Sequence, residues 1–375
     1  MLTRFRGIFR IVWLGSVYSF ALIGFVLTAG FVAVKFGWSN TSGTVDAETE
    51  TFNETAAKVA NLASAATPDV VVLEDQQNPT EKHELCKVAV IGKVSSKTAS
   101  VIATTYQAQN SLPLLINMVQ AAVFRMPEDK QASLRACESS TQPVVLSELI
   151  SSLSPDGPSI YAWQNSEQWQ TIEKAILKDT KVLASAAATA EVSQRSILSV
   201  CLVEQLRLYF TQRELFEKVF APLSILSSAT KNAWGVMAIK EETAIATEEH
   251  LKDPSSPFYL GSDKANLLNF STTDVASERY NRLTNGRDHK YSYLYGSLFI
   301  AQLEVQWERA GHPIGNRPEI MATLFNLGFK KSKPKADPQV GGAALTIADT
   351  EYSFGGLAYE IYYSGVLQDT FAFDN

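Results

Sequence analysis

The chain has few residues of the kinds that build metal or cofactor sites. It contains only three cysteines and four histidines among 375 residues, and none of them has the close spacing typical of metal ligands. No glycine-rich phosphate-binding loop occurs. The 33 basic and 39 acidic residues give a net charge of −6, which is not the footprint of a nucleic-acid-binding protein. The sequence therefore predicts no cofactor, no metal and no nucleic-acid partner.

The three cysteines have different expected roles. Cys201 falls in an apolar segment and should behave as a small buried residue. Cys86 and Cys137 could form a disulfide if this part of the chain lies outside the cytoplasm. The sequence leaves that pairing open.

The amino-terminal segment predicts a membrane anchor. Residues 1–10 include three arginines, and residues 11–34 contain no charged residue, so the second segment is long enough to span a bilayer as a helix. A cleaved signal peptide is the alternative, but the apolar run continues beyond the small residues at 28–30. The arginine bias places the amino terminus in the cytoplasm. We therefore expect a single-pass membrane protein whose residues beyond the span lie outside the cytoplasm.

Residues 35–82 predict a flexible linker, because they are acidic and polar and have no sustained apolar periodicity. A helical region should follow at 83–155, with helices near Thr98 to Gln107 and Leu112 to Arg125. Between them and the linker, the apolar run Lys87 to Gly92 predicts a short strand or a buried extended segment.

A second, larger helical region is expected at 156–375, with the join near Pro155. A long helix should run from Ser166 to about Ala190. Further helices are expected to begin at Lys290 and at Pro318, and the aromatic tail should dock on the core as an extended segment plus an amphipathic helix. The expected fold class is mainly α.

Glu204 is the candidate catalytic residue. It lies in the segment Ser196 to Phe210, on the same helical stripe as Ile197, Val200 and Cys201. Burial on that stripe favours the protonated carboxyl group that a general acid needs. The alternative is an ion pair with Arg207, three residues further on.

Two later segments complete a recognisable order of motifs. A polar stretch containing Ser228 ends in Gly235-Val236-Met237-Ala238-Ile239 and then Thr243-Ala244, and a third block runs Ala322-Thr323-Leu324-Phe325-Asn326-Leu327-Gly328. Together with the Glu204 helix, these blocks resemble the lysozyme-like lytic transglycosylases. Ala238 stands where that family usually has a glutamine, and Phe325 replaces its usual tyrosine.

The resemblance implies a lysozyme-like domain that binds peptidoglycan and cleaves its glycan strands. It implies Glu204 as the only catalytic carboxylate. Residues expected to bind the substrate are Ser228, Gly235, Met237, Phe325 and Asn326. For Asn326 the alternative is a helix cap.

Two other functions stay open. The chain could be a membrane-tethered protein that binds the cell wall on the same fold without cleaving it, which the change at Ala238 permits. It could also be a protein-interaction module that does not bind glycan.

Overall fold

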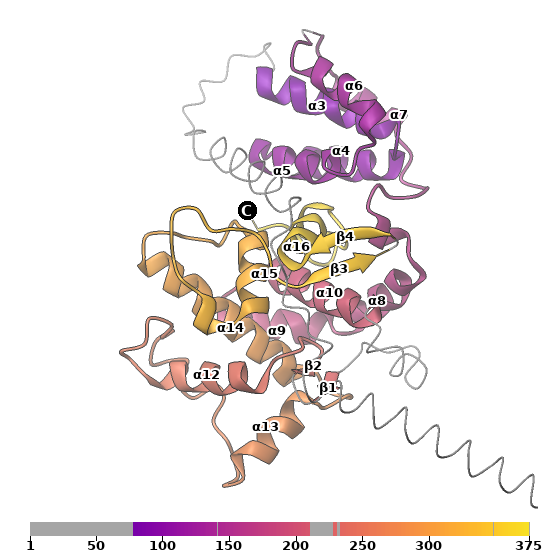
Figure 1. The fold of residues 1–375 in the computed structure, drawn as a ribbon. Helices are drawn as coiled ribbons and strands as arrows, with labels where there is room; N and C mark the ends of the chain where they lie inside the picture. Colours follow the sequence, from indigo (N-terminus) through magenta and orange to yellow (C-terminus); the bar gives the residue numbers. More distant parts are fainter. Residues whose placement is uncertain (1–77, 141, 211–227, 231–232, 348, 375) are drawn as a thin grey trace, which may run out of the picture. The chain divides into compact units, whose positions relative to one another are not determined.

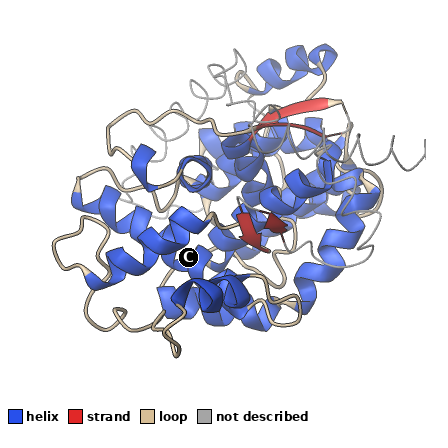
Figure 2. Ribbon diagram, turned by 60° about the horizontal axis from the view of Figure 1, so that its bottom comes forward, coloured by secondary structure: helices blue, strands red, loops and turns tan. Residues whose placement is uncertain are grey.

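The computed structural model describes residues 78–140, 142–210, 228–230, 233–347 and 349–374. The chain divides into the units Met1–Thr44 and Val45–Asn375, and all described residues belong to the second. They are mainly helical, as predicted, and Figures 1 and 2 show two small hairpins among the helices. No described helix is long and apolar enough to cross a membrane. The predicted span at 11–34 lies outside the described residues.

The first helices form a group of their own. They are α3 (Pro79–Gly92), α4 (Ser96–Gln109), α5 (Leu112–Val123), η1 (Glu128–Lys130), α6 (Gln131–Cys137) and α7 (Leu146–Ser152). Helix α3 starts with Asn78, whose side chain accepts a hydrogen bond from the Thr80 N–H at 2.9 Å. Residues 79–82, predicted as part of the linker, are therefore the first turn of α3, and the rest of the predicted linker up to residue 77 lies outside the described residues.

The predicted strand at Lys87 to Gly92 is wrong, because this segment is the second half of α3. Leu85, Val88 and Ile91 are fully buried, and their spacing of three places them on one helical face. Packing on this face outweighs the β propensity of the valines and the isoleucine. The predicted helices near Thr98 and Leu112 are confirmed as α4 and α5.

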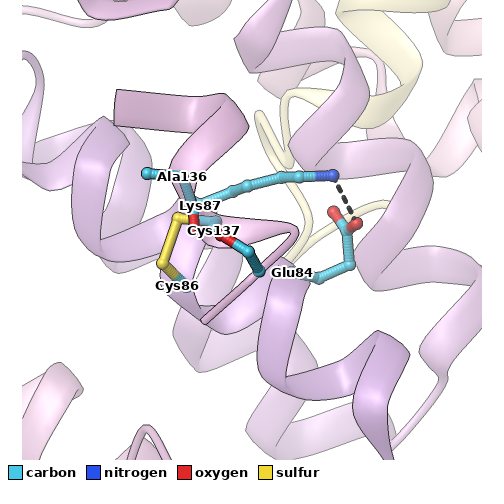
Figure 3. The surroundings of a disulfide bond; sticks show 6 residues. Glu84, Cys86, Lys87, Ala136 and Cys137 are labelled. Atoms are coloured by element: carbon cyan, nitrogen blue, oxygen red, sulfur yellow. Dashed lines mark hydrogen bonds and ion pairs between the residues drawn. A yellow bond between two sulfur atoms is a disulfide. The ribbon is translucent and has the colours of Figure 1, made fainter. Parts of the chain in front are cut away.

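A disulfide joins Cys86 of α3 to Cys137 at the end of α6, with 5.6 Å between the two Cα atoms. Figure 3 shows it beside the ion pair of Glu84 and Lys87, whose Oε1 and Nζ atoms are 2.7 Å apart. The pairing that the sequence left open is thus formed. It fixes α6 against α3.

The central helices lead to Glu204. They are η2 (Ala162–Asn165), α8 (Glu167–Lys178), α9 (Thr180–Ala190) and α10 (Gln194–Phe210). The prediction of a single helix from Ser166 to Ala190 is wrong, because the helix is interrupted at Asp179 and continues as a second helix. The Asp179 carboxylate lies 2.6 Å from His289 Nδ1 and accepts a hydrogen bond from the Tyr293 hydroxyl at 3.0 Å. These contacts fix the break against a later helix.

Helix α10 is buried on almost every side, since it contacts α8, α9, α14, α15 and α16. Even Arg195, near its start, is fully buried. The Arg195 guanidinium donates to the carbonyl oxygens of Tyr362, Val366 and Phe371 at 2.8 to 3.2 Å. Arg195 therefore fixes the carboxyl-terminal segment to the start of α10.

The remaining elements surround this helix. They are β1 (Ser228–Thr230), β2 (Ala233–Gly235), α12 (Glu241–Lys252), α13 (Val275–Leu283), α14 (Lys290–Arg309), α15 (Pro318–Leu327), η4 (Phe329–Lys331), β3 (Ala344–Ile347), β4 (Thr350–Ser353) and α16 (Phe354–Tyr363). The predicted helices at Lys290 and Pro318 are confirmed as α14 and α15. The aromatic tail forms the β3–β4 hairpin and α16, and α16 packs on α10 and α15.

A buried carboxylate ties α16 to the first group of helices. Glu360 of α16 is 1% exposed and forms an ion pair with Arg125, which follows α5. Burial raises the pKa of Glu360 to about 7, although Arg125 and the Trp163 side chain act in the opposite direction. The Tyr161 hydroxyl is buried nearby and has no hydrogen-bond partner among the described residues. The stability of this buried cluster therefore depends on whether Glu360 is ionised.

Removing the disulfide should lower the free energy of unfolding. The bond closes a loop across a sequence separation of 51 residues, for which chain entropy predicts a loss of about 4 kcal/mol. The measurement is urea unfolding of the full-length protein with both Cys86 and Cys137 replaced by alanine. As a control, dithiothreitol should destabilise the wild type and leave the double variant unchanged. Equal stability of the two proteins would contradict the prediction.

Glu360 should make stability fall as the pH rises from about 5 to about 7. The pKa of Glu360 is higher in the folded protein than the ordinary value of 4.5. Its contribution to the free energy of unfolding is therefore complete below pH 4.5 and is lost as the pH rises past 7. The expected loss is roughly 3 kcal/mol. Urea unfolding of Glu360→Gln at several pH values should show a shallower slope in this range. Burial also raises the pKa of Glu304 to about 7. Glu304 therefore makes its own contribution to the pH dependence of the free energy of unfolding, and Glu304→Gln is the matched control. Identical slopes for Glu360→Gln and the wild type would contradict the assignment.

Candidate functional site

Glu204 lies near the end of α10 and is 4% exposed, so the predicted burial is confirmed. Its Oε2 atom forms an ion pair with Arg207, 2.7 Å from Nη2 and 2.8 Å from Nε. The alternative partner that the sequence left open is therefore present. Arg207 would have to move away from Oε2 before this oxygen could donate a proton to a substrate.

The predicted glycine-centred turn consists of Gly235 to Ala238. Trp234 and Ile239 close it with two backbone hydrogen bonds of 2.8 and 2.9 Å. Gly235 and Ala238 have φ angles of 74° and 47°, and only glycine adopts such angles without steric cost. Ser228 pairs with Gly235 across the β1–β2 hairpin. Helix α12 then begins at Glu241.

Both polar groups of one peptide bond in this turn are held by buried side chains. The Val236 carbonyl accepts a hydrogen bond from Gln205 Nε2 at 2.8 Å, and the Met237 N–H donates to Ser292 Oγ at 3.1 Å. Gln205 belongs to α10 and follows Glu204 directly, whereas Ser292 belongs to α14. The turn is thus fixed to the helix of Glu204 on one side and to α14 on the other.

The close approach of this turn to α14 requires glycine at two positions. A Cβ at Gly235 would lie 2.4 Å from Ser292 Oγ and 2.5 Å from the Leu283 carbonyl oxygen. A Cβ at Gly296 would lie 2.8 Å from Met237 Cε. Met237 is fully buried, so its side chain fills the space that Gly296 leaves. It lies inside the protein and does not face solvent.

The third block lies on α15 and is largely buried. Phe325 is 6% exposed, and its ring centroid lies 5.0 Å from that of Phe299 on α14. Asn326 Oδ1 accepts a hydrogen bond from the Ala343 N–H at 3.0 Å. Its side chain therefore holds the segment before β3, and the helix-cap alternative is wrong. The Asn326 backbone carbonyl accepts a longer hydrogen bond from Lys240, at 3.3 Å.

The three predicted blocks are brought together around α10 and α14. The first block joins the second through Gln205, and the second joins α14 through Ser292 and Gly296. The third joins α14 through Phe325 and the end of the turn through Lys240. The structure thus places near one another segments that are more than 100 positions apart in the sequence.

Cys201, one turn before Glu204, belongs to a second polar cluster. Its sulfur lies 4.0 Å from the Tyr293 hydroxyl, which donates to Asp179. Burial raises the pKa of the Cys201 thiol, so the sulfur stays protonated and is a poor nucleophile. Cys201 is fully buried and free of disulfide bonding, as predicted.

The sequence analysis did not find Gln205 and Ser292. Gln205 is fully buried within an apolar helix, and a buried carboxamide requires a polar partner. Ser292 lies four positions before Gly296, which places both on one helical face. These two features were visible in the sequence, but their common partner, a single peptide bond, was not.

No protein-family model, no curated protein and no solved structure matches this chain. The case for its function therefore depends on the residues of the site itself.

Replacing Gln205 with leucine should destabilise the protein by about 1–3 kcal/mol, because the buried Val236 carbonyl loses its donor. The measurement is urea unfolding of the full-length chain. The matched control is Gln194→Leu on the same helix, since the Gln194 side chain makes no hydrogen bond among the described residues. A loss for Gln205→Leu no larger than for the control would show that the contact does not hold the turn.

Proposed function

We propose that this chain is a membrane-anchored lytic transglycosylase on a lysozyme-like helical fold. Its substrate would be the β-1,4 bond between N-acetylmuramic acid and N-acetylglucosamine in peptidoglycan. The observation that supports this most strongly is the hydrogen bond from Gln205 to the Val236 carbonyl. It joins the helix of a buried glutamate to a Gly-Val-Met-Ala turn, and these are the two motifs whose order in the sequence resembles that family.

In the proposed reaction Glu204 acts first as acid and then as base. It donates its proton to the glycosidic oxygen as the bond to the anomeric carbon breaks and an oxocarbenium-like centre develops. The resulting carboxylate then removes the proton from the 6-hydroxyl of the same sugar, and that oxygen bonds to the anomeric carbon. The products are an anhydro sugar and a chain end with a free hydroxyl, and Glu204 regains its proton.

An exposed aromatic residue next to the turn supports glycan binding. Tyr280 of α13 is 41% exposed, and its ring centroid lies 5.4 Å from that of Trp234, with the rings nearly perpendicular. Aromatic rings with an exposed face can pack against the apolar faces of sugars. Since Trp234 directly precedes Gly235, Tyr280 would extend the glycan surface beyond the turn.

The disulfide of Cys86 and Cys137 supports the proposed location of this region outside the cytoplasm. Disulfides persist in oxidising compartments such as the bacterial periplasm. The amino-terminal segment would anchor the protein in the inner membrane.

The second candidate is a wall-binding protein on the same fold that does not cleave glycan. The ion pair of Glu204 with Arg207 favours it, because Oε2 is already occupied.

Replacing Glu204 with glutamine should abolish product release from peptidoglycan. Loss of a general acid reduces turnover by roughly 10²–10⁴-fold. The measurement is mass spectrometry of soluble products after incubating full-length protein with purified peptidoglycan. The wild type should release anhydro-ended muropeptides.

The matched control is Glu84→Gln, because Glu84 is also buried and also pairs with a basic residue three positions further on, Lys87. It should keep wild-type activity. Undiminished product from Glu204→Gln would contradict the proposal. Retention on peptidoglycan without product from any of the three proteins would favour the wall-binding alternative.

A further inference from the structure

A cavity of about 310 Å³ lies between the end of α4 and the carboxyl-terminal segment. It is lined by Thr104, Thr105, Ala108, Gln109, Gln368, Asp369, Ala372 and Phe373. Its size is at the lower end of the range of small-molecule sites. None of these residues belongs to the candidate site around Glu204.

The carboxyl-terminal segment forms one wall of the cavity, and Arg195 holds this segment in place. Phe373 packs on the buried guanidinium of Arg195, with its ring centroid 3.9 Å from Cζ. Arg195 also holds the backbone at Val366 and Phe371. The Thr105 hydroxyl lies 2.5 Å from Gln368 Oε1 and so connects the two walls. The cavity is therefore bounded by fixed elements.

Several polar groups at this cavity have no protein partner. The side chains of Gln109 and Asp369 form no hydrogen bond or ion pair with the described residues, and Gln368 uses only one of its two amide atoms. Carboxamides both donate and accept hydrogen bonds, and a carboxylate accepts them. These three side chains can together satisfy a ligand that presents several hydroxyl groups.

The charge of the lining narrows the class of ligand. It includes no lysine or arginine, and its single ionisable residue is Asp369, so an anionic ligand would meet no opposite charge. Ala108 and Ala372 are exposed at the cavity and give apolar surface for the carbon face of a sugar ring. We propose that the cavity binds a neutral mono- or disaccharide, as a carbohydrate site separate from Glu204.

Binding of N,N′-diacetylchitobiose to the full-length protein tests this proposal, measured by isothermal titration in a detergent without a sugar headgroup. We expect saturable binding that Gln109→Leu and Asp369→Ala each weaken by about tenfold or more, the usual size of a lost hydrogen bond to a charged or well-placed polar group. The matched control is Gln107→Leu on the exposed face of α4, which should bind like the wild type. Gln109 and Asp369 lie outside the candidate site around Glu204, so loss of binding in these two variants reports on the cavity and is independent of the proposed catalytic function.

Absence of saccharide binding in the millimolar range would overturn the proposal. So would binding that Gln109→Leu and Asp369→Ala leave unchanged. Binding of a lysine-containing tripeptide in place of chitobiose would also contradict it, because Asp369 would then be a site for an ammonium group.

Discussion

The structure depends on the burial of α10. This helix contacts five others, and its side chains fill the interior that they enclose. Burial drives its polar side chains to find partners, because an unpaired group in the interior costs free energy, although Arg195 Nη2 has none among the described residues. Arg195 is paired with backbone carbonyls, Gln205 with the Val236 carbonyl, and Glu204 with Arg207. The position of the carboxyl-terminal segment and that of the turn both follow from these pairings.

The need to pair the buried polar side chains of α10 also determines the position of the turn at Gly235 to Ala238. Gln205 and Ser292 fix both polar groups of its central peptide bond, and two glycines allow the backbone to approach α14. These contacts leave little freedom for the turn to move relative to Glu204. Such an arrangement would suit the proposed binding of a glycan strand next to one carboxyl group. The Met237 side chain is fully buried in this packing.

Local sequence features predicted the elements that local forces determine. The helices expected near Leu112 and at Pro318 are present as α5 and α15, and the apolar stripe predicted that Glu204 is buried. The segment Lys87 to Gly92 was misassigned, because its apolar residues suit a strand as well as a helix and only packing decides between them.

The tertiary contacts of the site could not be predicted in the same way. The hydrogen bond from the Ala343 N–H to Asn326 and the one from Gln205 to the Val236 carbonyl each join residues that are well separated in the sequence. Nothing in the residues near either partner specifies the other. The break at Asp179 likewise depends on His289 and Tyr293, more than a hundred positions later.

The central claim is that Glu204 and the adjoining turn cleave glycan by attack of the sugar's own hydroxyl group. The most direct test is to digest peptidoglycan with the full-length protein in water labelled with oxygen-18 and to determine the masses of the products by mass spectrometry. The account predicts anhydro-ended muropeptides whose newly formed ends contain no oxygen-18. Products with oxygen-18 at the reducing end would show hydrolysis by water, and the absence of any product would contradict a glycan-cleaving role.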